Sequence, residues 1–179
     1  MRLRVSVFLL VGILAASVAQ AQQVTGFIES FNVIKTTGTT TQINIWAKGP
    51  IKDKVGWSLW SLTSESWSEA YAGLTFAPTS WVAVSASLGL ESDADPLRVG
   101  GSVWVGKGRW SLLSIHESGG SGRWHRNIAL YQATKTVAIG VDNIRFFGTG
   151  LHAEKKFGKV TLWGTCAVNK GIAGARFNF

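Results

Sequence analysis

Apolar and polar side chains alternate with a period of two through most of this chain. In the clearest stretch, 81–91, Val82, Val84 and Leu88 share one face, whereas Ser85 lies on the other with further small residues. Such alternation is typical of a β-strand with two different environments, and a helix would need a repeat near 3.6. The chain is therefore predicted to consist of strands, each with one apolar face.

The same pattern divides the chain into about twelve segments separated by turn signals. The predicted strands are 24–35, 41–48, 54–62, 67–77, 81–91, 97–106, 109–118, 123–133, 135–142, 144–154, 159–168 and 171–179. Most approach the roughly 9 to 11 residues that a tilted strand needs to cross a bilayer. We predict an all-β fold, a single up-and-down antiparallel transmembrane β-barrel of about twelve strands, with ten as the alternative. The register of 24–35 and 109–118 stays open, because each carries residues that conflict with a single apolar face.

The amino end reads as a secretory signal. Arg2 and Arg4 precede the apolar stretch 5–18, and Ala19-Gln20-Ala21 has the small-x-small form of a cleavage site. Cleavage after Ala21 would leave 158 of the 179 residues, 22–179, as the barrel domain. A membrane anchor is the alternative, but the apolar stretch is shorter than the roughly 20 residues that a spanning helix needs.

The cysteine count and the charge content also favour a barrel. Cys166 is the single cysteine, so an intrachain disulfide is excluded, although exported proteins often depend on one. A closed ring of hydrogen-bonded strands gives stability without disulfides. Only 16% of the residues are charged, which suits a surface that faces lipid.

The carboxy end continues the alternation to the last residue, since the chain ends in ARFNF with Phe177 and Phe179 on one face. This end resembles the assembly signal of Gram-negative outer-membrane β-barrels. The resemblance is to the class, not to a particular family within it. It implies location in the cell outer membrane, contact with outer-membrane lipid and lipopolysaccharide, and recognition of Phe179 by the barrel-assembly machinery.

The predicted turns fall into two alternating sets. One set is small and polar (TTGTT, TSES, SDADP, SGGSG, DN, NKG), and four of the five turns in the other carry lysine (KGPIKD, APTS, GKG, TK, KKFG). With an even number of strands, the lysine-bearing set would lie with both termini on the periplasmic side. The short turns provide neither a plug nor a lid.

Charges are distributed unevenly along the chain. The predicted mature part has a net charge of +6, yet 55–97 holds five acids and no base, whereas 98–179 holds twelve bases and three acids. Strand order is angular order in such a barrel, so we predict an acidic wall opposite a basic wall. The predicted lumen-lining residues are Glu69, Glu91, Arg98, Ser102, Trp104, Arg126, Asp142, Trp163 and Arg176. Dispersed basic residues argue against nucleic acid as a partner.

One group of residues suggests chemistry. Ser114, His116 and Ser118 share a face, and a hydroxyl beside an imidazole is what acyl transfer requires. The His-x-Ser spacing resembles that of outer-membrane lipid A deacylases, which also take an acid from the neighbouring strand. Here 123–133 contains no acid, and Glu117 points to the opposite face. We therefore predict no enzyme, no metal site and no cofactor, with an acyl hydrolase as an alternative.

The sequence leaves several functions open. The first hypothesis is a narrow channel for small hydrophilic solutes, anions included, because Arg98, Arg126 and Arg176 would attract them. The alternatives are a sealed structural or adhesive barrel and the acyl hydrolase. A secreted β-sandwich or lipocalin-like binder would need a dry, apolar interior, and the predicted inward residues argue against it.

Overall fold

Twelve β-strands and no helix make up the part of the chain that the computed structural model describes, residues 24–179. The predicted signal, 1–21, lies outside these residues. The strands are β1 (Thr25–Lys35), β2 (Gly38–Lys52), β3 (Val55–Ser64), β4 (Ser68–Thr79), β5 (Val82–Glu91), β6 (Leu97–Lys107), β7 (Trp110–Gly119), β8 (Gly122–Gln132), β9 (Val137–Ile144), β10 (Gly148–Phe157), β11 (Val160–Ala167) and β12 (Lys170–Asn178). Within this range no helix is long and apolar enough to span a bilayer.

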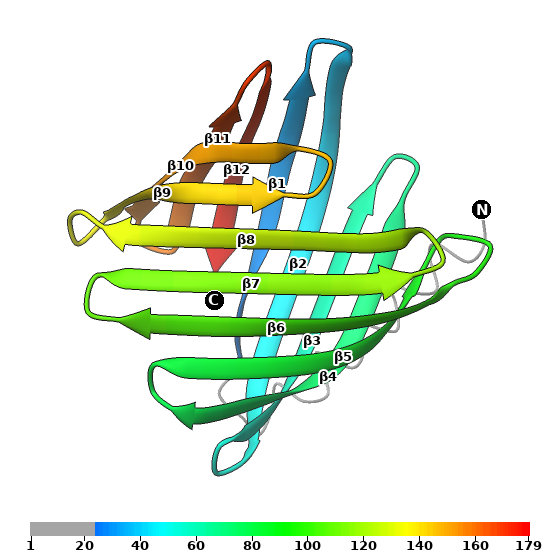
Figure 1. Ribbon diagram of the computed structural model, residues 1–179. Coiled ribbons are helices and arrows are strands. Elements are labelled where there is room, and N and C mark those ends of the chain that lie inside the picture. Colours follow the sequence, from blue (N-terminus) through cyan, green and yellow to red (C-terminus); the bar gives the residue numbers. More distant parts are fainter. Residues whose placement is uncertain (1–23) are drawn as a thin grey trace.

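The strands form a closed ring in which each pairs antiparallel with its neighbours in the chain. β1 completes the ring by pairing with β12, from Phe27 opposite Asn178 to Lys35 opposite Lys170. In Figure 1 the strands of the front wall run across those of the rear wall, as expected for strands inclined to a barrel axis. The predicted fold class, an up-and-down antiparallel barrel of twelve strands, is confirmed.

Strand positions agree with the sequence except for β2, β9 and β10. β2 is longer than predicted because the Thr39–Thr41 segment pairs with the end of β1, and its other end contains a register shift near Pro50. The turn predicted at 142–143 is wrong. Both residues belong to β9, and the connection to β10 is 145–147, where Phe146 has a positive φ of 69°.

Apolar side chains cover the outside of the barrel and polar ones are buried within it. Leu74, Leu88 and Leu162 are 59%, 64% and 49% exposed, whereas Glu29 and Asp142 are 1% and 0% exposed. A water-soluble protein has the opposite distribution. This arrangement is the one expected of a membrane-spanning barrel, and it disagrees with the secreted sandwich or lipocalin-like alternative.

The structure fixes the two open registers. On β1 Glu29 is buried inside the barrel with Phe31, and on β7 Glu117 is buried while Leu112 is exposed on the outside. On β1 an apolar residue can face inward because the interior beside it holds an apolar cluster. That cluster consists of Phe31, Phe147, Trp163 and Ile172.

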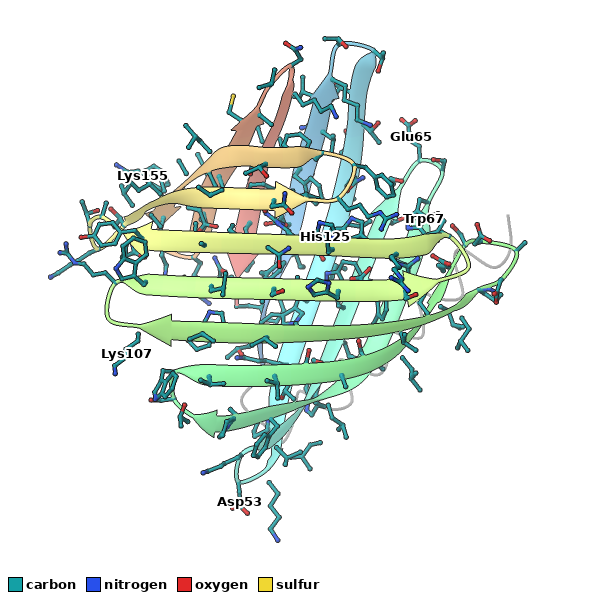
Figure 2. All side chains as sticks on the ribbon, viewed as in Figure 1. Asp53, Glu65, Trp67, Lys107, His125 and Lys155 are labelled. Carbon is teal, nitrogen blue, oxygen red and sulfur yellow. The ribbon has the colours of Figure 1, made fainter. Side chains whose placement is uncertain are left out.

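Alternate turns gather at opposite ends of the barrel. Figure 2 shows Asp53, Lys107 and Lys155 towards one end, hereafter the lysine end, and Glu65 and Trp67 towards the opposite end. The two predicted sets of turns are thus separated in space. Which end faces the periplasm remains a prediction.

Leu74 provides a test of the outward apolar face, because it lies in the middle of β4 and is 59% exposed. We expect Leu74→Arg to lower the free energy of unfolding in lipid vesicles by about 2–4 kcal/mol, the cost of placing a cation on the lipid face near the bilayer centre. Urea titration followed by tryptophan fluorescence measures it. Leu74→Met is the matched control, with an expected loss below about 1.5 kcal/mol. Equal losses for the two variants would contradict the assignment.

Candidate functional site inside the barrel

Arg98 is the centre of a buried network, hereafter the Arg98 network. The guanidinium group of this β6 residue contacts Glu69 on β4, Glu91 on β5 and Glu117 on β7, so four adjacent strands are joined. Nε lies 3.4 Å from Glu69 Oε2, and Nη2 lies 3.5 Å from Glu117 Oε2. Nη1 donates to Glu91. Arg98 is only 3% exposed, so these pairs have little contact with water.

Hydroxyl groups complete the Arg98 network. Arg98 Nε donates to Tyr71 Oη at 2.6 Å, and Tyr71 Oη donates to Glu117 Oε2 at 3.1 Å. Glu91 accepts from the Ser121 backbone N–H at 2.8 Å and from the Ser121 hydroxyl at 2.7 Å. Since Ser121 belongs to the turn between β7 and β8, the network also holds that turn in place.

A second network, hereafter the Asp142 network, occupies the wall from β8 to β11. Arg126 donates to Asp142 through Nε at 3.1 Å and Nη2 at 2.7 Å, which is the two-point geometry that suits a carboxylate. Thr165 Oγ1 donates to the same carboxylate at 3.1 Å, and His152 Nδ1 lies 2.8 Å from that hydroxyl. The indole of Trp163 lies under the Arg126 guanidinium, 5.4 Å from it.

The Asp142 network extends across the closure of the barrel. Glu154 lies 3.2 Å from His152 Nε2 and 3.6 Å from Arg176 Nη1. Arg176 Nε donates to Glu29 Oε2 at 2.8 Å, which joins β12 to β1. Charges near the two ends of the chain therefore stabilise the strand pair that completes the ring.

The predicted acidic and basic walls differ from the structure. The two networks hold six carboxylates and three arginines, and every arginine among them contacts at least one carboxylate. Isolated charges are costly in a poorly hydrated interior, and paired ones are much less so. Acids and bases are thus interleaved, and carboxyl groups outnumber guanidinium groups in the two networks.

A small cavity lies beside the Arg98 network. Its volume is about 90 Å³, and serines and glycines of β5 and β6 form much of its wall. Trp46, Trp60 and Tyr71 line it from β2, β3 and β4. This space is large enough for several water molecules.

The structure places the nine predicted lumen residues in three settings. Glu69, Glu91, Arg98, Arg126, Asp142, Trp163 and Arg176 belong to, or contact, the two networks. Ser102 lines the cavity, and its Oγ is 2.7 Å from Ser85 Oγ. Trp104 shares the strand face of Ser102 but is 38% exposed near the lysine end, where its ring covers Gly106.

The predicted lumen residues do not include several members of these networks. These members are Tyr71, His152, Glu29 and Glu117. Alternation could have identified His152, which is two residues from Glu154 on β10. No local pattern indicates that Glu29 meets Arg176, because the two residues are 147 positions apart.

The three candidate catalytic residues lie on the outside of the barrel, away from both networks. Ser114 Oγ is 3.0 Å from His116 Nε2, whereas Glu117 points inward to Arg98 as expected. Ser118 is exposed on the same outer face. In 24–179 no group of three or more His, Cys, Asp or Glu residues is arranged to hold a metal ion.

Comparison with solved structures places the fold among outer-membrane barrels. The KdgM porin matches with a TM-score of 0.59 and 10% identity over 86% of this chain and 99% of that chain. The NanC porin has a TM-score of 0.52 and 6% identity over 86% and 98%. Outer membrane phospholipase A from Escherichia coli has a TM-score of 0.52 and 9% identity over 87% and 92%.

The fold is that of an outer-membrane β-barrel. No protein-family model matches the sequence, and no curated protein is found to be similar to it. Identities of 6% to 10% show a shared architecture and no shared activity. The predicted resemblance to outer-membrane barrels is therefore confirmed for the fold.

Arg98 allows a test of the buried network. We expect Arg98→Ala to lower the free energy of unfolding by about 3–5 kcal/mol, because it leaves buried carboxylates without their counter-charge. Urea unfolding in vesicles measures the loss. Arg123→Ala is the matched control, since Arg123 is exposed on the outer face of β8, and its expected change is within about 0.5 kcal/mol. Similar losses would show that the Arg98 pairs contribute little.

Proposed function

We propose that this protein is a narrow outer-membrane channel for small hydrophilic solutes. The observation that carries the proposal is the wall of Ser85, Ser87, Gly100 and Ser102 beside the interior cavity, within a barrel whose outside is apolar. Small polar residues leave space and offer hydrogen bonds, as a water-filled path requires. Twelve strands place the barrel between small filled barrels and wide porins, so a restricted path fits its size.

Porins with similar folds support this proposal. The KdgM porin has also been solved in complex with disordered oligogalacturonate, and that structure matches this chain with a TM-score of 0.61 and 11% identity, over 86% of this chain and 99% of that one. That ligand is a property of the KdgM porin. For this chain we propose smaller solutes, because the cavity of about 90 Å³ is bordered by Trp46 and Trp60.

The interior charges favour cations or neutral solutes over anions. An anion site needs a guanidinium group with free donors and little competing negative charge. Arg98, Arg126 and Arg176 all contact carboxylates, and the carboxylates of their networks outnumber them. We therefore propose that passage is limited mainly by size, with a weak preference for cations.

The compartment follows from the same proposal. A leader cleaved after Ala21 would deliver the chain to the periplasm, and Phe179 would then mark it for the barrel-assembly machinery. Phe179 closes the barrel wall, since its N–H donates to Gly26 O at 3.0 Å and its side chain is 42% exposed. The inserted barrel would contact outer-membrane lipid and lipopolysaccharide through its apolar surface.

A sealed structural barrel is the second candidate. The apolar cluster of Phe31, Phe147, Trp163 and Ile172 occupies the interior on the side of β11, β12 and β1. Together with the Asp142 network it places buried side chains in that half of the barrel. If the serine-rich half does not conduct, the protein would be a membrane scaffold.

Planar-bilayer recording separates these candidates. We expect the folded protein to give small, discrete conductance steps, and a potassium chloride gradient to give a reversal potential of the sign for modest cation preference. A folded protein that inserts and never conducts would support the sealed barrel. Anion preference would contradict the charge assignment and leave the channel proposal intact.

Trp60 is the residue whose removal should widen the path. It lines the cavity, and its ring packs 5.2 Å from that of Tyr71. We expect Trp60→Ala to raise the single-channel conductance about two-fold or more, because a narrow path conducts in proportion to its cross-section. Trp81→Ala is the control, since Trp81 is 44% exposed in a turn at the lysine end. An unchanged conductance in Trp60→Ala would place the conducting path elsewhere.

A further inference from the structure

A polar patch, hereafter the outer polar patch, interrupts the apolar outside of the barrel on β7 to β10. Its members project outward and bond to one another. They are Ser114, His116, His125, Asn127, Asn143 and Thr149. The near wall that carries them faces the viewer in Figure 2, where His125 is labelled on β8.

Strand pairing shows that the outer polar patch lies within the apolar band and not beyond it. Along β7 and β8 the outward pairs run from Trp110–Tyr131 and Leu112–Ala129 to Ser114–Asn127 and His116–His125. On β6 the residue opposite Ser114 is Val103, and the apolar face continues past it through Val99 to Leu97, which are 49% and 59% exposed. Polar groups at such a position are costly in lipid. Where they occur, they typically mark a functional site.

The outer polar patch places a hydroxyl between an imidazole and an amide. Ser114 Oγ lies 3.0 Å from His116 Nε2 and donates to Asn127 Oδ1 at 2.6 Å. An amide can exchange its oxygen and nitrogen positions by rotation, and with its NH₂ group towards Ser114 it donates to the hydroxyl oxygen. The hydroxyl proton is then directed at His116. This is the relation between nucleophile and base that acyl transfer requires.

The surface beside His116 is open to a lipid molecule. The residue opposite His116 on β6 is Gly101, and the next residue around the barrel is Ala86 on β5. These two positions form a shallow strip on the outside, because neither carries a bulky side chain. An acyl chain lying against Val103 and Leu112 could therefore bring its ester group to Ser114.

We propose that Ser114 and His116 form a hydrolytic site on the outer wall for ester-linked acyl chains of membrane lipids. The Ser114 hydroxyl oxygen attacks the ester carbonyl carbon while its proton passes to His116 Nε2. The bond from that carbon to the alkoxy oxygen breaks, and His116 returns the proton to the departing alcohol. A water molecule, deprotonated by His116, then releases the fatty acid and restores Ser114.

Asn127 lies on the neighbouring strand, where a deacylase-like site would carry an acid. It lies directly opposite Ser114 on β8, and it acts as a positioning residue by orienting the hydroxyl. The ring of His125 lies 6.0 Å from that of His116, and its Nε2 lies 3.1 Å from Asn143 Oδ1. His116 Nε2 contacts the Ser114 hydroxyl, so Ser114, and not Ser118 of the His-x-Ser spacing, is assigned as the nucleophile.

Fatty-acid release from vesicles tests the site. Refolded full-length protein is added to diacyl phosphatidylethanolamine and phosphatidylglycerol vesicles in one arm, and to vesicles with lipopolysaccharide in the other. We expect fatty-acid release in at least one arm and none from ether-linked phospholipid. The released acyl chain, plain or 3-hydroxylated, distinguishes the two sources.

Variants assign the residues. Ser114→Ala and His116→Ala should lower the release by about 10³-fold or more, as loss of a nucleophile or its base does. Asn127→Ala should lower kcat and leave KM for the lipid unchanged. Ser30→Ala is the control, since Ser30 is exposed on the outer face of β1, and it should match the parent. Heat-modifiable migration on gels verifies that each variant is folded.

A covalent probe keeps the test independent of the lipid supplied. A fluorophosphonate should add to the parent, and peptide mass spectrometry should locate the adduct on Ser114. A folded parent protein that shows neither the adduct nor fatty-acid release overturns the proposal. This holds also if the protein is found to dimerise through the outer polar patch. Release that persists in Ser114→Ala, or that is lost in Ser118→Ala instead, overturns the assignment.

Discussion

Every backbone N–H and C=O of this sheet needs a partner, because the outside of the barrel is too apolar to hold the water that would otherwise supply one. The pairing of β1 with β12 removes the last two open edges. Closure of the sheet also requires strands of similar length and short turns. It leaves the apolar side chains outside and the polar side chains inside. The ion pair of Glu29 with Arg176 adds side-chain contact at the same seam.

Closure also dictates how charges can be accommodated. Inward positions of twelve short strands face a confined interior, so a carboxylate there must meet a guanidinium group or a hydroxyl. The Arg98 and Asp142 networks are two solutions on opposite sides of the barrel, and both combine ion pairs with hydroxyl donors. The small residues of β5 and β6 lie beside the first network, where the interior keeps a cavity. A size-limited path is the function that this division of the interior favours.

The fold could be predicted from the sequence because alternation is a local property that each strand carries by itself. The segments 24–35 and 109–118 obscured it, because their inward faces combine apolar and charged residues. The inward face of 24–35 is explained by the packing of Phe31 against Trp163 inside the barrel. The networks could not be predicted, because Arg98 and Glu117 become neighbours through inter-strand register, which a one-residue slip would change. The same limit hid the contact of Ser114 with Asn127, thirteen positions away.

The lone cysteine offers the most direct test of the central claim, that this barrel faces lipid outward and encloses a polar interior. Cys166 is exposed on the outside of β11, and its neighbour Thr165 is buried inside. A fluorophore on Cys166 should be quenched strongly by brominated acyl chains. The same fluorophore at Thr165→Cys, in a Cys166→Ser background, should be quenched weakly. Equal quenching at both positions, or stronger quenching at position 165, would contradict the account.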